Sequence, residues 1–174
     1  MTIFTLGHST HTLEAFIEIL NAHGVRGVID VRRFPASRRH PHFNRELFAA
    51  ELAKHDIEYE WLPDLGGRRA ARADSRNTRW RNASFRGYAD YMETPAFVDA
   101  ITRVEAIASV RASAIMCAEV VWWSCHRSLI ADYLTARGAV VSHIVDARKS
   151  EPHRYTEPAQ IVDGRLSYAE ARLI

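Results

Sequence analysis

The chain has 174 residues, 47% of them hydrophobic, which is enough for one domain with a substantial core and too short for two ordinary domains. Its formal net charge of +2 excludes a strongly acidic or basic protein, although arginines are concentrated in the first half, which favours an anionic partner. Because the sequence has two cysteines, no apolar run of ~18 residues and no charged-then-apolar leader, we expect a cytoplasmic protein that makes no membrane contact.

Strands and helices alternate along the first half of the chain. Short apolar runs bounded by glycine or polar residues predict strands, and apolar residues at helical spacing predict the helices between them. The resulting order is a strand at 3–6, a helix from Leu13 that closes before Gly24, a strand at 27–32, a helix at 45–55 and a strand at 58–62.

The second half begins with a polar, arginine-rich stretch at 66–84 that has no clear period, and we interpret it as a long surface loop. Loops longer than about 15 residues in compact domains are often lids or binding segments. Beyond it the patterns predict helices at 88–92 and 95–108, a buried strand at 113–117, a helix at 128–137, a strand at 140–145 and a small hairpin at 161–166 around Asp163-Gly164.

This alternation predicts a single α/β domain over residues 1–174, with a largely parallel sheet of about five strands flanked by helices and a small C-terminal hairpin. A half-barrel, TIM-like arrangement is the alternative topology. Ligands bind at the carboxyl ends of parallel strands, and here those ends carry polar residues or glycine. They are Gly7-His8-Ser9, Asp30-Val31-Arg32, Asp64-Leu65-Gly66-Gly67, Cys117-Ala118-Glu119 and Asp146.

Both cysteines lie at one predicted strand-to-helix junction. Cys125 precedes a helix, where backbone amides, His126 and Arg127 favour a thiolate, so it is the candidate nucleophile. Cys117 ends an apolar strand and is typical of a buried, unreactive thiol. Metal binding by these thiols with His8, Asp30, Glu119 and His126 is an alternative, but the spacing does not match a zinc knuckle, so no metal ligand is predicted.

Two further patterns bear on chemistry. Arginine forks suit phosphate and aromatic rings stack on bases, so Arg32, Arg86, Arg127 and Tyr88 are candidate substrate-binding residues, with His8 and Ser9 positioning the substrate. Glu119 and Asp30 are candidate acid and base residues, as in enzymes that cleave N-glycosides, although each could instead pair with an arginine.

Short motifs occur along nearly the whole chain. They are Gly7-His8-Ser9-Thr10, Asp30-Val31-Arg32-Arg33-Phe34-Pro35, Ser37-Arg38-Arg39, Pro41-His42-Phe43-Asn44, Leu62-Pro63, Leu65-Gly66-Gly67, residues 84–92, Met116-Cys117-Ala118-Glu119, Cys125-His126-Arg127 and His143-Ile144. As a set these motifs resemble the DUF488 family, a domain of unknown function. The resemblance implies an α/β domain of bacterial type without implying an activity. Residues 120–124, Val-Val-Trp-Trp-Ser, are more apolar here than in many members.

These observations leave three classes of function open. The leading hypothesis is an enzyme acting on a phosphate-bearing substrate, a nucleotide or nucleic acid, at the carboxyl edge of the sheet. In it Arg32, Arg86 and Arg127 hold the anion, while Cys125 or Glu119 acts as nucleophile or acid/base. The alternatives are a non-catalytic nucleotide- or nucleic-acid-binding module and a thiol-based redox or metal-binding protein. The sequence names no cofactor and leaves the oligomeric state open.

Overall fold

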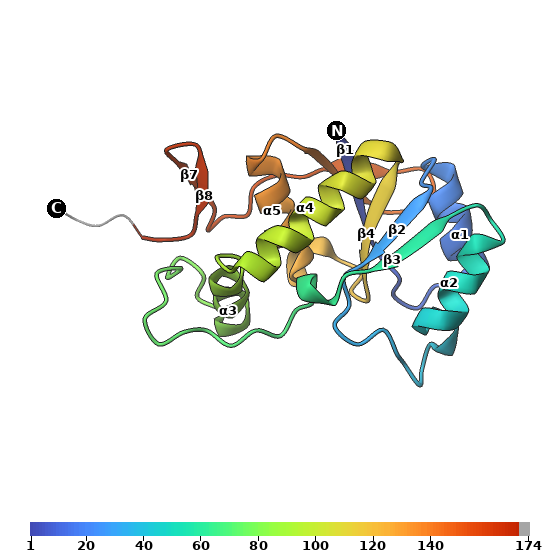
Figure 1. Cartoon of the computed structure of the whole chain (residues 1–174), viewed down its shortest axis with the longest axis horizontal. Coiled ribbons are helices and arrows are strands. Elements are labelled where there is room, and N and C mark those ends of the chain that lie inside the picture. Colours follow the sequence, from blue (N-terminus) through green and yellow to red (C-terminus); the bar gives the residue numbers. More distant parts are fainter. Residues whose placement is uncertain (171–174) are drawn as a thin grey trace.

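A computed structural model describes residues 1–170 as a mixed α/β domain (Figure 1). Three short 3-10 helices also occur, at Pro41–Phe43, Pro63–Leu65 and Trp122–Ser124. The strands and α-helices, in chain order, are β1 (Thr2–Gly7), α1 (Leu13–Ala22), β2 (Gly27–Asp30), α2 (Arg45–Ala53), β3 (Glu58–Trp61), α3 (Ala83–Tyr91), α4 (Pro95–Val110), β4 (Ser113–Cys117), α5 (Arg127–Ala136), β5 (Val140–Ile144), β6 (Ser150–Pro152), β7 (Gln160–Val162) and β8 (Arg165–Ser167).

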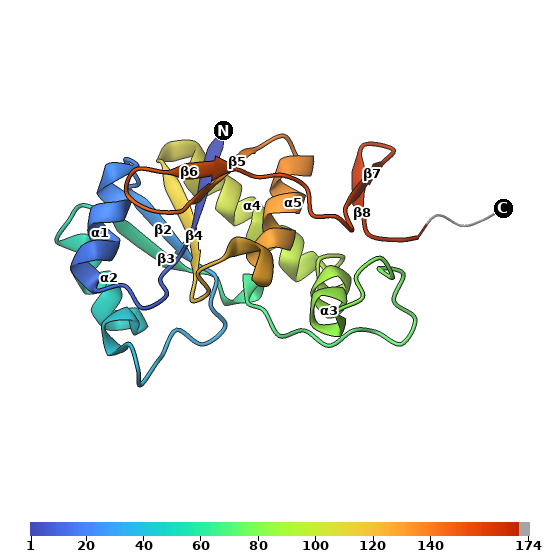
Figure 2. The same ribbon diagram turned by 180° about the vertical axis from the view of Figure 1, so that it is seen from behind.

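The main sheet has six strands in the order β3-β2-β4-β1-β5-β6. Strands β1 to β5 are parallel, as predicted, and β6 adds an antiparallel edge strand that the sequence patterns missed. The sheet is open, with β3 and β6 at its edges, so the half-barrel alternative is not adopted. The predicted C-terminal hairpin is confirmed as β7 and β8, which project beside α5 (Figure 2).

Helices cover both faces of the sheet. On one face α1 and α2 pack Phe16, Leu20 and Phe48 against the sheet. On the other face α3, α4 and α5 contribute a second apolar cluster that includes Phe97 and Leu129. Helices on both faces explain why β2 and β4 are continuously buried rather than alternating. Among residues 1–170, no helix is long and apolar enough to cross a membrane.

Helix α3 begins five residues earlier than the predicted start at Tyr88. The Asn82 side chain accepts hydrogen bonds from the backbone amides of Ser84 and Phe85, which caps the helix at that point. The polar composition of residues 82–87 concealed this start, because the helix shows its apolar face only from Phe85 onward.

The long loop between Gly66 and Asn82 is tied to α3. The Asp90 carboxylate accepts from the Arg72 backbone amide at 2.8 Å, the Ser75 hydroxyl at 2.5 Å and the Asn77 amide at 2.8 Å. A Cβ on Gly87 would lie 2.1 Å from the Arg69 carbonyl oxygen, so the loop backbone lies directly against the helix. The loop is therefore anchored along its middle rather than hinged only at its ends.

Candidate functional site

The candidate site lies between β1 and β4, where the chain reverses the direction in which it winds across the sheet. Strands β1 and β4 are neighbours, but the helices that follow them, α1 and α5, pack on opposite faces of the sheet. A crevice opens at the carboxyl ends of two such strands, and ligands of open α/β proteins bind there. The segment after β4 contains both cysteines and leads into α5.

Gly7 allows the two strand ends to come this close. A Cβ at Gly7 would lie 1.7 Å from the Glu119 carbonyl oxygen. Backbone pairing continues past the strands, since the amides of His8 and Ser9 donate to the carbonyls of Cys117 and Ala118 at 2.9 and 3.0 Å. The first glycine of the Gly7-His8-Ser9 motif is therefore needed for the shape of the site.

A cleft of about 560 Å³ opens at this edge of the sheet. It combines thiols, a carboxylate, an imidazole, guanidinium groups and aromatic rings. Its lining residues are Arg32, Arg33, Phe34, Ala36, Gly67, Arg68, Ser84, Phe85, Tyr88, Cys117, Ala118, Glu119, Ser124, Cys125 and His126.

Cys125 is 6% exposed and has polar contacts on two sides. Its sulfur lies 3.4 Å from the Cys117 sulfur and accepts from the backbone amide and the Nε of Arg127, at 3.4 and 3.3 Å. The hydrogen bond from Cys117 and the positive charge of Arg127 lower the pKa of the Cys125 thiol to about 6, although burial opposes this. Cys125 is therefore a thiolate at neutral pH.

Cys117 has the opposite character. Burial and its hydrogen bond to Cys125 raise the pKa of the Cys117 thiol well above its usual value. It stays protonated and donates to the Cys125 thiolate. The two cysteines thus form one unit, with the charge on the residue closer to the helix.

Arg127 is buried rather than open to the cleft, with 1% exposure. Its Nη2 donates to the carbonyls of Glu119 and Val120 at 2.6 and 3.1 Å, and its Nη1 donates to the Thr5 hydroxyl at 3.3 Å. These bonds hold the guanidinium behind the thiolate, so that its charge acts on Cys125 from inside the protein.

His126 and Tyr88 form one wall of the cleft, with ring centroids 5.2 Å apart. Burial lowers the pKa of His126 to about 4, so the imidazole is neutral, and its Nε2 donates to the Val31 carbonyl at a long 3.4 Å. The Nδ1 then carries a lone pair and lies near Gly67. Tyr88 donates its hydroxyl to the Leu65 carbonyl, so it offers its ring rather than its oxygen.

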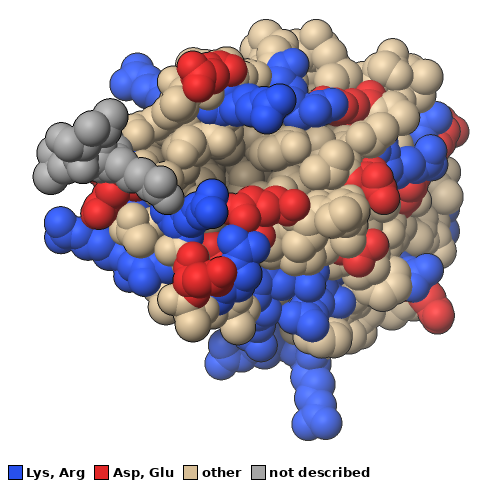
Figure 3. Space-filling model, turned by 60° about the vertical axis from the view of Figure 1, so that its left-hand side comes forward, with Lys and Arg blue, Asp and Glu red and all other residues tan. Residues whose placement is uncertain are grey.

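The rim of the cleft is exposed and carries both signs of charge. Glu119, Arg33 and Arg68 are exposed there, and Phe34 is 71% exposed beside them. Basic side chains gather along the lower part of the face seen in Figure 3. The loop that follows Gly67 contributes exposed arginines to the surface at Arg68, Arg72, Arg76 and Arg81.

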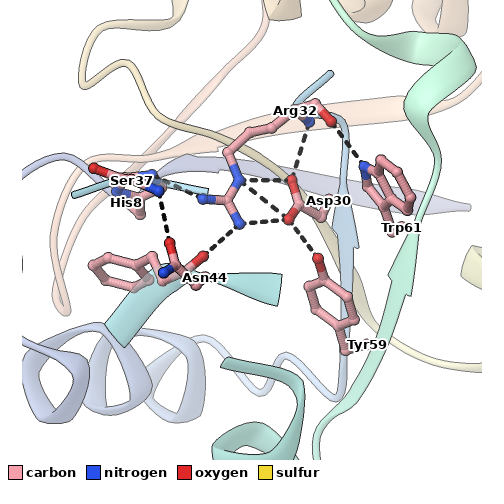
Figure 4. A network of polar contacts seen from close by, with 8 residues as sticks. His8, Asp30, Arg32, Ser37, Asn44, Tyr59 and Trp61 are labelled. Carbon is pink, nitrogen blue, oxygen red and sulfur yellow. Dashed lines mark hydrogen bonds and ion pairs between the residues drawn. The ribbon is translucent and has the colours of Figure 1, made fainter. Parts of the chain in front are cut away.

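A second polar network fills the adjacent strand end (Figure 4). Asp30 is fully buried and pairs with Arg32, whose Nη2 lies 2.6 Å from the carboxylate. The Tyr59 hydroxyl donates to the same carboxylate at 2.5 Å, and burial followed by the negative charge of Asp30 raises the pKa of Tyr59. Asp30 therefore forms an ion pair and does not line the cleft.

His8, which directly follows β1, extends this network from the end of β2 to the end of β1. Its Nδ1 donates to the Ser9 carbonyl, its ring stacks on Phe43, and its Nε2 lies 3.4 Å from Arg32 Nη1. Burial lowers the pKa of His8 to about 4, so Nε2 is an acceptor for Arg32. The nearby Ser9 has a φ of 48°, in the left-handed region that turns the chain away from β1.

The structure thus brings together five of the predicted site residues: Arg32, Tyr88, Glu119, Cys125 and His126 line the same cleft. The remaining five, His8, Ser9, Asp30, Arg86 and Arg127, lie outside its lining, and Arg86 donates its Nε to the Trp80 carbonyl.

Arg33, Phe34, Arg68 and Phe85 line the cleft but were not singled out as site residues. Arg33, Phe34 and Arg68 lie next to polar strand-end motifs, and this position is the one signal that could have found them. Phe85 carried no such signal, since its position depends on how α3 packs. Within the described part of the chain, no group of three or more His, Cys, Asp or Glu side chains could hold a metal ion.

Fold and site together define an open α/β protein, wound in both directions from β1, with two adjacent cysteines at a cleft where the winding reverses. The family model for the domain of unknown function DUF488 matches residues 12–134, which is most of the chain, and the protein belongs to this family. Searches among curated proteins and among solved structures find no match.

Proposed function

We propose that this protein is an enzyme that uses the Cys125 thiolate as a nucleophile on a phosphate-bearing substrate of the nucleotide class. The observation that carries the proposal is a thiol of lowered pKa on the wall of a cleft with arginines at its rim. Thiolates are the reactive form of cysteine, and a pKa below neutrality keeps that form populated.

The chemistry of the rim supports the substrate class. Arg33 and Arg68 are exposed where a phosphate could be bound by charge-assisted hydrogen bonds. Phe34 and Phe85 offer aromatic faces at the same cleft, and such faces stack on bases. Arg32 has one hydrogen left for the substrate, on Nη1, because Asp30, the Phe43 carbonyl and His8 Nε2 accept the others.

In this proposal the Cys125 thiolate attacks an electrophilic atom of the substrate and forms a covalent bond to it. The leaving group departs with the electron pair of the broken bond and takes a proton from Glu119 or from water. A water molecule, deprotonated by the Glu119 carboxylate, then displaces Cys125, which leaves again as a thiolate. The neutral His126 serves as a hydrogen-bond acceptor through Nδ1.

The first test is the pH dependence of Cys125 alkylation by iodoacetamide, with the adduct located by peptide mass spectrometry. We expect a midpoint near the Cys125 pKa of about 6, well below the ~8.5 of an unperturbed thiol. A midpoint near 8.5, or a thiol that resists alkylation until the protein unfolds, would contradict the proposal.

The substrate class is tested by binding. Nucleoside mono- and diphosphates should raise the melting temperature of the wild-type protein, and the Arg33→Gln, Arg68→Gln double variant should lose most of this shift. Arg26→Gln is the matched control, because Arg26 is exposed and precedes β2 at the opposite edge of the sheet. Equal shifts in all three proteins would rule out binding at this rim.

Polymer binding separates the enzyme from a non-catalytic nucleic-acid-binding module. Such a module would hold single-stranded or duplex nucleic acid with an affinity that falls steeply between ~50 and ~200 mM salt. For a small-molecule enzyme, turnover of a discovered substrate should instead be lost in both Cys125→Ser and Glu119→Gln. If both variants retain turnover, the assigned roles are wrong.

One observation favours a second candidate function, thiol redox chemistry. The sulfurs of Cys117 and Cys125 are 3.4 Å apart, and one is a thiolate beside a thiol. A peroxide would oxidise Cys125 to a sulfenic acid, and attack by Cys117 would release water and leave a disulfide. The expected product is a chain lighter by about 2 Da that dithiothreitol restores. A sulfinic acid at Cys125 without a disulfide would exclude this function.

A further inference from the structure

A line of buried polar side chains lies behind the thiol, on the side away from the cleft. It connects Arg127 on α5 to Asp132, about 1.4 turns further along the same helix, through residues of β1, β5 and the segment after β6. Arg127, Thr5, His143 and Asp132 are 2% exposed or less, and the His153 side chain is 1% exposed.

Each neighbouring pair in this line is within hydrogen-bond distance. Arg127 Nη1 lies 3.3 Å from Thr5 Oγ1, which lies 2.7 Å from His143 Nδ1. His143 Nε2 lies 2.9 Å from His153 Nδ1, and His153 Nε2 lies 2.9 Å from the Asp132 carboxylate. Thr5 and His143 are register partners on β1 and β5, so the sheet itself sets their contact.

The chemistry of the two ends determines the direction of the hydrogen bonds. A carboxylate only accepts, so His153 donates to Asp132 through Nε2, and a neutral His153 then accepts at Nδ1. His143 donates to it through Nε2 and accepts at Nδ1 from the Thr5 hydroxyl. The Thr5 oxygen then accepts from Arg127, which only donates. Every bond therefore points from Arg127 toward Asp132.

The reverse order fits less well. A protonated His153 would donate to His143, and His143 would donate to Thr5. The Thr5 oxygen would then accept from both His143 and Arg127, and its own hydroxyl hydrogen would have no acceptor among its contacts in the described chain. Leaving a buried donor unpaired costs about 1–3 kcal/mol. His143 is neutral in both orders, in agreement with its pKa, which burial lowers to about 3, so the unpaired hydroxyl is what disfavours the reverse order.

The line cannot deliver a proton to Cys125, because Arg127 stands between them and a guanidinium does not give up its proton in proteins. It can orient the guanidinium. With Nη1 held by Thr5 and Nη2 by two carbonyls, Nε is left facing the Cys125 sulfur. Trp122, from the segment between the two cysteines, stacks on the His143 ring at 4.1 Å and encloses the line.

We propose that Thr5, His143, His153 and Asp132 are positioning residues that hold Arg127 against Cys125 and so maintain the thiolate. This inference rests on the proposed function, since it assigns these residues to the nucleophile named there. Of the five residues in the line, Arg127 contacts Cys125, and the other four act through Arg127.

The first test uses the wild-type protein labelled with ¹⁵N-histidine. Nuclear magnetic resonance should show His143 and His153 as neutral Nε2–H tautomers at pH 7. An Nδ1–H tautomer of His143, or a doubly protonated His153, would overturn the direction of the line without bearing on the reactivity of Cys125.

The second test is the alkylation midpoint of Cys125 in a matched pair of variants. Thr5→Val keeps the branched shape of the side chain but removes the hydroxyl, and we expect the midpoint to rise by about 1 pH unit, which is a tenfold loss of thiolate below the midpoint. Thr5→Ser restores the hydroxyl and should restore the wild-type midpoint. His143→Phe keeps the ring beneath Trp122 but breaks the line, and should shift the midpoint as Thr5→Val does.

A purely structural role would lower the melting temperature of Thr5→Val and His143→Phe while leaving their alkylation midpoints at the wild-type value. That result would overturn the inference while the proposed function stands. A wild-type midpoint near 8.5 would instead overturn the proposed function, and the two failures are thereby distinguished.

Discussion

At the scale of single residues, burial decides which of the charged groups are available to a ligand. Asp30 and Arg32 lie at the end of β2 and were both candidates for chemistry, yet they form an ion pair with each other inside the protein. A buried ion pair costs much of its attraction in lost hydration, but removing one partner leaves an unpaired charge in the interior.

Asp30→Asn should therefore destabilise the protein by about 3–5 kcal/mol, measured by urea denaturation, because Arg32 keeps its charge and loses its partner. Glu51→Gln is the control, since Glu51 and Lys54 form an exposed pair and should leave the free energy of unfolding almost unchanged. Equal effects of the two variants would show that the Asp30 pair contributes nothing beyond a surface contact.

Gly7→Ala tests the close approach of β1 to the segment after β4. The added methyl group would meet the Glu119 carbonyl, so the segment must move, and we expect a loss of stability of roughly 1–3 kcal/mol together with a changed rate of Cys125 alkylation. Gly24→Ala is the control. It strains a backbone with a φ of 66° but meets no atom, so it should lower stability and leave the alkylation rate as it was.

At the scale of elements, the anchoring of the 66–82 loop depends on one carboxylate. Burial of Asp90 disfavours its charge, but hydrogen bonds from Ser75, Asn77 and the Arg72 amide outweigh this and hold the pKa of Asp90 below its usual value. A group with a lowered folded-state pKa adds stability above its unfolded pKa of ~3.9 and loses it as the pH falls through the folded value.

In the wild-type protein the protection factors of amides in the 66–82 loop, which compare their exchange rates with those of an unfolded chain at the same pH, should therefore fall below about pH 4. Asp90→Asn should show low protection factors in the loop at every pH, because a side-chain amide oxygen cannot accept from three donors at once. Slow exchange in Asp90→Asn at pH 7 would mean that the contacts around Gly87 hold the loop without the carboxylate.

At the scale of the whole molecule, the segment beyond the family match completes the domain. The family model ends at residue 134, but β5 and β6 lie further along the chain and pair in the main sheet. Asp132 also depends on this segment, since it accepts from His153, from both the amide and the hydroxyl of Thr156, and from the Tyr168 hydroxyl.

We expect residues 1–174 to unfold in urea as one cooperative unit. Tryptophan fluorescence reports on β3, on the 66–82 loop and on the segment between the cysteines through Trp61, Trp80, Trp122 and Trp123, whereas circular dichroism reports on all elements. The two transitions should coincide for a single domain. Separate midpoints would show that part of the chain folds independently.

The local patterns of the sequence determined the order and type of most elements, because the period of apolar residues is a property of the chain alone. They located the candidate site only as far as the strand ends and the segment that leads into α5, where Glu119, Cys125 and His126 occur. They missed β6, whose three residues are too few to show a period, and the start of α3, which Asn82 sets with a side-chain cap.

Tertiary structure decided which charged groups face the cleft and which are enclosed. Arg127 directly follows Cys125-His126 in the sequence, yet its guanidinium turns inward because Thr5, Glu119 and Val120 offer acceptors there. The contacts of Asp132 with His153 and of Thr5 with His143 join residues 21 and 138 positions apart. No local pattern encodes such pairs, because they arise only when β1, β5 and α5 pack together.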